Sequence, residues 1–376
     1  MKNFITSTFF YFFAILLFIV LLFFVVPEFL GSKVLNSDWF ESNKESESVE
    51  IEEKIIVPTI PPLNTIAYDL KLEELANNPA PKVVEPKIDP KTGQPIQAPT
   101  SLPNLWPVKT VYPNAGAILP FNRVIAYYGN LYSKQMGVLG EYDEPEMLER
   151  LNAEVVKWQS VDPTTSVAPA LHYIAVVAQV NAGADGKYRA RMPDSEIEKV
   201  LKIAEKINAI VFLDVQVGLS DLQTEVPLLE KYLKLPNVHL GVDPEFSMKT
   251  GVKPGKVVGT LDAVDINSSV DFLAKIVKEN NLTPKILVVH RYTQKMVTNY
   301  KEIKSLPEVQ IVMHMDGWGG AAKKKNTYLQ FIHKEPVQFT GFKLFYKNDI
   351  LEPGTVLMTP EELLKLSPKP IYIQYQ

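Results

Sequence analysis

The chain has 376 residues, no cysteine and a formal net charge of −4 at pH 7. The absence of cysteine excludes disulfides, cysteine-based metal sites, a cysteine nucleophile and a lipidated cysteine anchor. The acidic balance argues against a general nucleic-acid role, because such a role needs a basic surface. A lysine run at residues 323–325 lies in a helical pattern and is interpreted as a solvated helix face.

Residues 9–26 form an unbroken apolar run that ends at Pro27. The run is longer than the apolar core of a secretory signal, which is usually about 7–15 residues, and no small-residue cleavage site follows it. We therefore predict an uncleaved transmembrane anchor at residues 1–30. Lys2 lies on the short side of the run, so the positive-inside tendency predicts that the rest of the chain is extracytoplasmic.

Residues 31–107 are predicted to form a disordered linker. Its first part is acidic and rich in serine, and prolines recur from residue 58 to residue 107. A proline-rich segment stays extended, so this linker is interpreted as a spacer between the membrane and the next domain. A short helix is expected within it, at residues 68–75.

From about residue 120, strand and helix signals alternate to the end of the sequence. This alternation implies right-handed parallel crossovers, and eight strands imply closure. We predict a (β/α)8 barrel of the TIM type at residues 108–376. No helix signal follows the eighth strand, and residues before 120 are expected to cover that gap. The strands are expected at residues 124–128, 167–176, 209–217, 238–246, 285–292, 309–316, 339–346 and 371–375.

Three of the intervening helices have a recognisable start, because a capping residue stands three positions before a glutamate. These capping residues are Asp143, Ser195 and Thr359. In the second of these helices, apolar residues recur at helical spacing and predict a stripe that packs on the outside of the barrel. The stripe consists of Ile197, Val200, Leu201, Ala204 and Ile207.

Polar residues end several of the predicted strands. Asp243 and Glu245 end the fourth strand, and residues two apart project from the same face of a pleated strand. The outer face of a barrel strand must meet apolar helix surface, so we expect the polar side chains to face the mouth of the barrel. Taken singly, a histidine there is more often structural, and Lys343 has the alternative role of pairing with Asp316. Together the strand ends predict an active or ligand-binding site.

Aromatic residues accompany these strand ends. Trp318 follows Asp316, for example, and flat rings beside carboxylates suit the apolar faces of sugars. The predicted substrate-binding residues are Tyr128, His172, Asp214, Gln216, His290, His314, Trp318, Lys343 and Tyr346.

Two long loops follow the first two predicted strands, at residues 130–141 and 177–193. Loops at this end of a barrel commonly form lids or binding walls. Arg189 and Arg191 in the second loop either hold an anionic substrate group or bond to the carbonyls of the loop itself.

From about residue 120 to residue 376 the chain resembles a group of uncharacterised exported bacterial proteins, through the runs at 127–130, 244–248 and 316–319. That resemblance implies a barrel fold and no activity. More loosely, the chain is similar to the chitinase-like glycoside hydrolases of family eighteen, whose fourth strand ends in Asp-x-Asp-x-Glu. In that family the Glu is the general acid and the last Asp orients the substrate's acetamido group. The resemblance places these roles on Glu245 and Asp243.

The chain also departs from the pattern of that family. Gly241 stands where the first Asp belongs, and the sixth strand ends in Met313-His314-Met315-Asp316 rather than Met-x-Tyr-Asp. The Ser-x-Gly-Gly strand of the family is absent.

The leading hypothesis is a membrane-tethered glycoside hydrolase that acts on a cell-surface or wall polysaccharide without a cofactor. Glu245 is expected to be the general acid, with its pKa raised by Asp243 and by burial. The second carboxylate is expected to be Asp316 or Asp214, and the predicted catalytic set is Glu245, Asp243 and Asp316.

Two alternatives stay open. One is a barrel that binds a glycan or a protein without catalysis, because barrel folds host many functions. The other is a metal-dependent hydrolase, such as a deacetylase or phosphodiesterase. Its nitrogen and oxygen ligands would come from His172, Asp243, Glu245, His290, His314 and Asp316.

Overall fold

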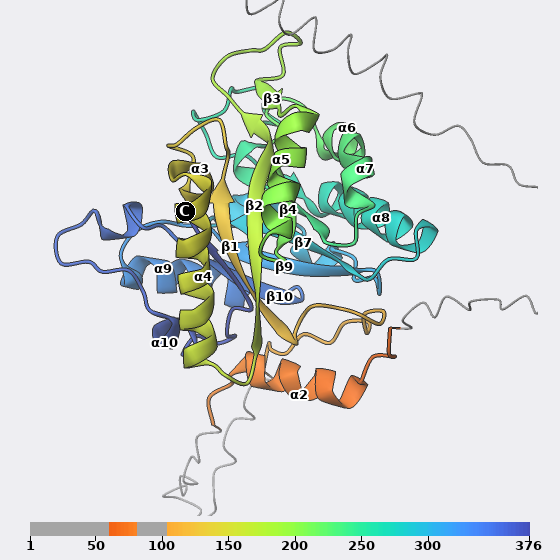
Figure 1. Ribbon diagram of the computed structural model, residues 1–376, viewed down its shortest axis with the longest axis vertical. Helices are drawn as coiled ribbons and strands as arrows, with labels where there is room; N and C mark the ends of the chain where they lie inside the picture. The colour runs from red at the N-terminus through yellow and green to blue at the C-terminus, as the bar shows by residue number, and fades with distance from the viewer. Residues whose placement is uncertain (1–59, 81–103) are drawn as a thin grey trace, which may run out of the picture. The chain divides into compact units, whose positions relative to one another are not determined.

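A computed structural model describes residues 60–80 and 104–376 of the chain (Figure 1). In this part, eight parallel strands close into a barrel, each paired with the next along the chain until the last returns to the first. The predicted TIM-type barrel is confirmed. Its strands are β1 (Asn122–Gly129), β2 (Ser166–Ala178), β4 (Ile210–Val215), β5 (Val238–Val242), β7 (Lys285–Arg291), β9 (Val309–Met315), β10 (Phe339–Leu344) and β11 (Tyr372–Tyr375).

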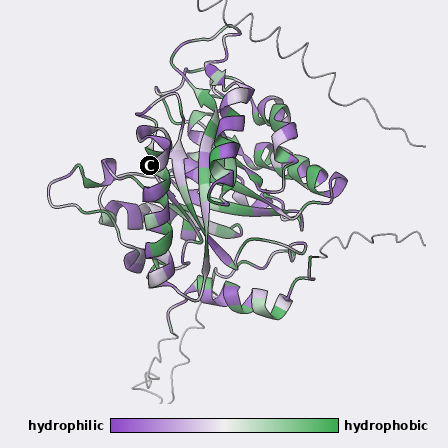
Figure 2. Cartoon of the chain, viewed as in Figure 1, coloured by the Kyte–Doolittle hydropathy of each residue, from purple (hydrophilic) through white to green (hydrophobic). Residues whose placement is uncertain are grey.

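Helices surround the barrel. Figure 2 shows apolar residues concentrated on the strands, whereas the helices carry both apolar and polar residues, as expected for helices with one face on a core. The connection from β7 to β9 contains short 3-10 turns and no α-helix. The helices between the strands are α3 (Val138–Glu141), α4 (Glu144–Val161), α5 (Asp194–Glu205), α6 (Leu222–Glu225), α7 (Glu230–Leu233), α8 (Ala263–Glu279), α9 (Ala321–Tyr328) and α10 (Pro360–Leu363).

Three short strands extend the loops at the carboxyl ends of the barrel strands. β3 (Arg189–Arg191) runs antiparallel to β2, whereas β6 (Leu261–Asp262) pairs in parallel with β8 (Val297–Thr298). They tie neighbouring loops together on the side of the barrel where the polar strand ends lie.

Two of the three predicted helix starts are confirmed. The Asp143 side chain accepts a hydrogen bond from the backbone N–H of Glu146, and Thr359 forms a capping box with Glu362. The start predicted at Ser195 is wrong, because Pro193 already supplies the extended residue before the first turn of α5. The predicted apolar stripe of α5 does pack on the barrel: its residues are buried or half-buried in the core that surrounds the strands.

The lower half of the barrel interior, at the amino ends of the strands, is apolar. Alternate residues of the strands point inward and fill it, because side chains on a strand alternate between its two faces. These side chains are buried and form one cluster, which includes Val124, Ala170, Phe212, Ile286 and Val312.

Helix α2 (Thr65–Ala76) lies across this lower end of the barrel (Figure 1). Tyr68 and Leu75 belong to the apolar cluster of the barrel interior. The backbone of Leu75 also accepts a hydrogen bond of 2.7 Å from Lys369 N–H, just before β11. The short helix expected here is confirmed, but this segment is no spacer, because an apolar barrel end needs a cover and α2 supplies it.

The predicted linker boundary at residue 107 is therefore wrong for the described residues. Trp106 is also buried, and its indole N–H donates a hydrogen bond of 2.9 Å to the carbonyl of His333. The remaining linker residues, 31–59 and 81–103, lie outside the described residues.

The expectation that residues before 120 replace an eighth outer helix is also wrong. Helix α4, which packs mainly on β1 and β2, reaches the last strand instead: Trp158 donates a hydrogen bond of 2.9 Å to the hydroxyl of Tyr375 on β11. Helix α10 lies against α4 on the same side. Helix α2, in contrast, packs against the apolar cluster at the lower end.

The predicted membrane anchor, residues 1–30, lies outside the described residues. Among the residues that the structure describes, no helix has both the length and the apolar character needed to cross a bilayer.

Candidate active site

The upper end of the barrel, at the carboxyl ends of the strands, opens into a cavity of about 550 Å³. This is the end where barrel enzymes hold their reacting groups. All three predicted catalytic residues line the cavity, together with four of the predicted substrate-binding residues. The set is Asp243, Glu245, Asp316, Tyr128, Gln216, Trp318 and Lys343.

The inward orientation of the polar strand ends is confirmed. On β4, the residues that face inward are Phe212, then Asp214, and then Gln216 just beyond the strand. The first belongs to the apolar cluster, the second to a layer of charged groups and the third to the cavity wall. One face of a single strand therefore passes from core to site in five residues.

Two glycines make room for the charged layer. A Cβ atom on Gly241 of β5 would clash with Asp214 and His172, and one on Gly341 of β10 would clash with His314 and Tyr372. The glycine at 241, which departs from the glycoside hydrolase pattern, thus has a packing role in this chain.

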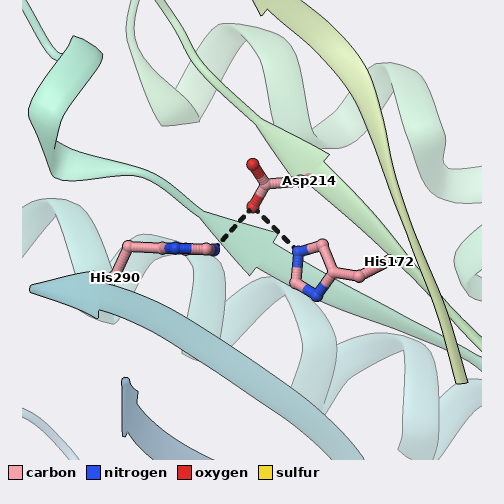
Figure 3. Close-up of side chains that lie close together, drawn as sticks. All are labelled: His172, Asp214 and His290. Atoms are coloured by element: carbon pink, nitrogen blue, oxygen red, sulfur yellow. Dashed lines mark hydrogen bonds and ion pairs between the residues drawn. The ribbon is translucent and has the colours of Figure 1, made fainter. Parts of the chain in front are cut away.

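The charged layer lies beneath the cavity floor and centres on Asp214. Its Oδ1 atom is 3.1 Å from His172 Nε2 and 3.3 Å from His290 Nε2 (Figure 3). The Tyr128 hydroxyl donates to Oδ2 at 3.2 Å, and His172 Nδ1 lies 2.6 Å from the Tyr372 hydroxyl. Asp214 and both histidines have no exposed surface. Because they are fully buried beneath the floor, these three side chains do not contact a ligand in the cavity directly.

His290 connects Asp214 to the cavity carboxylate Asp316, because its Nδ1 atom lies 2.8 Å from Asp316 Oδ2. Burial lowers the pKa of His290, but the two carboxylates outweigh burial and raise that pKa to about 10. Burial lowers the pKa of His172 to about 4. His290 is therefore the charged histidine of the layer and His172 is neutral.

Asp316 also pairs with Lys343, whose Nζ atom lies 3.0 Å from Asp316 Oδ1 and 3.8 Å from the centre of the Tyr128 ring. Burial acts to raise the pKa of Asp316, but Lys343 and His290 hold that pKa below its usual range. Lys343 therefore does form the ion pair with Asp316 that was considered as its structural role. This ion pair keeps Asp316 ionised.

The backbone turns at Asp243, so this residue and Glu245 do not project side by side from a strand. β5 ends at Val242, and Pro244–Phe246 forms a 3-10 turn in which Asp243 Oδ1 accepts a hydrogen bond of 3.0 Å from Glu245 N–H. The expectation of a shared strand face is wrong because proline cannot continue the ladder. Both carboxyl groups nevertheless line the cavity.

These two carboxyl groups have raised pKa values. Burial raises the pKa of Asp243 well above its usual range, and the Glu245 carboxyl adds to that shift. Burial also raises the pKa of Glu245, and the second cause is Asp316 rather than the expected Asp243.

The turn at Glu245 is held by its neighbours. The backbone carbonyl of Glu245 accepts a hydrogen bond of 2.7 Å from Gly259 N–H, so the following loop folds back over the turn. The Tyr292 hydroxyl hydrogen-bonds to the Glu245 carboxyl. Tyr292 lines the cavity but is missing from the predicted site. Its spacing of two residues from His290, on the same strand face, was the available signal.

Three of the predicted substrate-binding residues lie in the layer beneath the floor together with Asp214. They are His172, His290 and His314, all without exposed surface. His314 packs edge-on against the rings of His290 and Tyr372, and its ring nitrogens have no hydrogen-bond partner among the described residues. Burial holds its pKa well below the usual value, so it is neutral.

Tyr346 does not line this cavity, so the structure does not bring it together with the other predicted substrate-binding residues. Its hydroxyl donates to Glu154 Oε1 of α4 at 3.0 Å and lies 3.2 Å from the Tyr127 hydroxyl. Residues alternate in direction after Lys343, so Phe345 faces the cavity and Tyr346 faces the helix.

The two arginines of the loop after β2 bond within the protein. Arg189 Nε and Arg191 Nε pair with the two oxygens of buried Glu225 at 2.8 and 2.7 Å. The alternative of internal pairing is favoured over anion binding, although the partner is a carboxylate and not a carbonyl.

Among the described residues, two groups of side chains have ligand atoms close enough to hold a metal ion. The first is His172, Asp214 and His290, and the second is Asp243, His290 and Asp316, with ligand atoms within 4.8 Å of one another in each. His290 belongs to both groups. A metal ion bound in either group needs a ring nitrogen of His290 as ligand. That nitrogen must first lose the proton that it now directs toward Asp214 or Asp316.

The cavity therefore combines two kinds of carboxyl group on one surface. Glu245 and Asp243 hold their protons more strongly than usual, and Asp316 holds its proton less strongly. Carboxyl groups with pKa values pushed apart are typical of acid–base catalysis. Comparison of the chain with family models and with curated proteins found no match.

Proposed function

We propose that the protein is a membrane-anchored glycoside hydrolase that acts on an extracytoplasmic cell-surface or wall polysaccharide. One observation carries the proposal: Glu245, with a raised pKa, and Asp316, with a lowered pKa, line the same cavity. Hydrolysis of a glycosidic bond needs such a pair, an acid for the leaving oxygen and an ionised carboxylate. The exposed ring of Trp318 beside them suits the apolar face of a sugar.

Glu245 is the general acid in this proposal. It donates its proton to the glycosidic oxygen while the bond from that oxygen to the anomeric carbon breaks. Asp316 stabilises the positive charge that develops on the sugar ring, or removes a proton from the attacking water. Asp214, the other carboxylate considered for this role, lies beneath the floor and holds His290 in place.

Asp243 and Tyr292 position the acid. Asp243 accepts a hydrogen bond from the backbone of Glu245, and the Tyr292 hydroxyl bonds to its carboxyl group. Both contacts restrict where the acidic proton is presented, and positioning of this kind accounts for much of the rate in enzymes.

The test is hydrolysis of a panel of surface and wall polysaccharides by the full chain and by Glu245→Gln. Loss of the acid is expected to lower kcat by about 10²- to 10⁴-fold while leaving the melting temperature unchanged. Glu361→Gln, at a fully exposed position on α10, is the control and should keep full activity. A fully active Glu245→Gln contradicts the assignment. Glycan binding by both proteins without turnover points instead to a non-catalytic barrel.

A metal-dependent hydrolase is the second candidate, and the ligand groups around His290 favour it. Against it, the charges of this layer already balance: His290 and Lys343 are positive, and Asp214 and Asp316 are negative. Metal binding must displace the His290 proton, which two carboxylates and a pKa of about 10 oppose. Elemental analysis of the full chain, purified without chelator, decides between them. One tightly held divalent ion per chain favours the metal-dependent reaction.

A further inference from the structure

The lysine run at residues 323–325 is not a uniform solvated helix face. Lys324 is buried and pairs with Asp349 at 2.6 Å, and Lys325 is exposed and pairs with Glu362 at 3.7 Å. Lys323 is exposed like Lys325, but it lines the cavity and has no ion-pair partner among residues 60–80 and 104–376. Three adjacent lysines therefore have three different environments.

The Lys323 side chain is held in place. Its Nζ atom lies 4.5 Å from the centre of the Trp318 ring, a distance at which a cation and an aromatic face attract each other. Its stem lies across Gly319, where a Cβ atom would come within 2.9 Å of Lys323 Cδ. Gly319 has a φ of +126°, and its N–H donates to buried Asp349 at 2.9 Å. The buried pair of Asp349 and Lys324 thus fixes the turn on which Lys323 rests.

The two lysines that line the cavity, Lys323 and Lys343, differ in whether they are paired. Lys343 and Asp316 neutralise each other at 3.0 Å. Asp243 and Glu245 also line the cavity, but neither forms an ion pair with Lys323. Of the two lysines that line the cavity, Lys323 is therefore the one without an ion-pair partner in the part of the chain that the structure describes.

We infer that Lys323 and Trp318 form a subsite for an anionic group of the substrate, either a carboxylate or a phosphate on a sugar. This inference rests on the proposed function for its place in a reaction, because it makes the substrate an acidic glycan. The sugar ring contacts Trp318, and its anionic group pairs with Lys323. An ion pair of this kind favours acidic sugars over neutral ones, because only an anionic group forms a charge-assisted hydrogen bond with the ammonium group.

The test uses three monosaccharides that differ only at one carbon: glucose, glucuronate and glucose 6-phosphate. Binding to the full chain is measured by ligand-observed NMR and by the change in tryptophan fluorescence. At least one of the two acids is expected to bind about tenfold more tightly than glucose, since one charged hydrogen bond contributes about 1.5 kcal/mol or more. Tighter binding of glucuronate indicates a carboxylate subsite, and tighter binding of glucose 6-phosphate indicates a phosphate subsite.

Two matched lysine variants test whether the preference for the acids depends on Lys323. Lys323→Met keeps the length of the stem and removes the charge, and it is expected to abolish the preference for the acids. Lys325→Met makes the same change at the exposed lysine two residues away and should retain the preference. Equal binding of the three sugars, no binding of any, or a preference that persists in Lys323→Met overturns the inference. If Lys323-dependent acid binding is found but no polysaccharide is hydrolysed, the subsite stands and the proposed reaction fails.

Discussion

The two halves of the barrel interior are built from the same strands and have opposite chemistry. The lower half is apolar and is closed by α2, whereas the upper half is charged and opens into the cavity. On β4 the change occurs between Phe212 and Asp214, two residues apart on one face. Burial of apolar surface in the lower half favours folding, whereas burial of charge in the upper half costs free energy unless each charge is paired.

In the upper half, ion pairs between the buried charged groups offset the free-energy cost of burying them. His290 lies between Asp214 and Asp316, and Asp316 in turn pairs with Lys343. Removing one member of such a network costs more than the network itself contributes, because its partner is left buried and uncompensated. The comparison therefore predicts that the upper half is sensitive to loss of charge and the lower half to loss of volume.

The largest expected effect is at Asp214. Asp214→Asn removes one carboxylate from His290 and is expected to lower the free energy of unfolding by about 3–5 kcal/mol, measured by urea denaturation. Asp271→Asn, which breaks the exposed pair with Lys304, is the control and should cost less than about 1 kcal/mol. Equal costs for the two variants would show that the upper half does not depend on its charges.

The next effect tests the lower half. Tyr68→Ala removes a buried ring of α2 from the apolar cluster and is expected to cost about 3 kcal/mol of unfolding free energy. Ile66→Ala changes a residue of the same helix that is 75% exposed, and it should change stability by less than about 0.5 kcal/mol. If both variants unfold like the parent protein, α2 does not close the barrel in solution.

Gly241 tests the boundary between the halves. Gly241→Ala introduces a Cβ atom against Asp214 and His172, and overpacking of this kind is expected to cost about 1–3 kcal/mol. Gly317→Ala, whose Cβ has its nearest neighbour at 3.3 Å, is the control and should cost less. A Gly241→Ala protein as stable as the parent contradicts the close packing of the charged layer.

The change of stability with pH is gradual, because one group changes it by no more than about 1.4 kcal/mol per pH unit. The pKa of His290 is raised to about 10, so its contribution is complete below pH 6.5 and is lost as pH rises toward 10. The pKa of His172 is lowered to about 4, so stability falls as pH drops from 6.5 toward 4. The combined contribution of these two histidines is therefore greatest near pH 6.5, and thermal unfolding across this pH range measures it. His290→Gln should flatten the alkaline side alone, and an unchanged alkaline side in this variant contradicts the assignment of charge to His290.

Local patterns in the sequence were sufficient to predict the barrel and the direction of its polar side chains. A period of two residues indicates a strand, and a period of 3.6 residues indicates a helix. The period of two also tells which residues share a face of the strand. The inward direction of Asp214 and His314, for example, required no knowledge of their neighbours. The same pattern that places Lys343 inward turns Tyr346 outward, toward α4.

Tertiary structure alone decided how deep each inward residue lies and what covers the ends of the barrel. Depth depends on the register between strands, such as the pairing of His172 with Phe212 and of His290 with His314, and register is set by hydrogen bonds between residues far apart in sequence. For that reason the sequence could not separate Asp316 in the cavity from Asp214 beneath it. The docking of α2 is decided in the same way, because a 12-residue helix in a proline-rich segment is stabilised by the apolar barrel end that it covers and not by its own propensity.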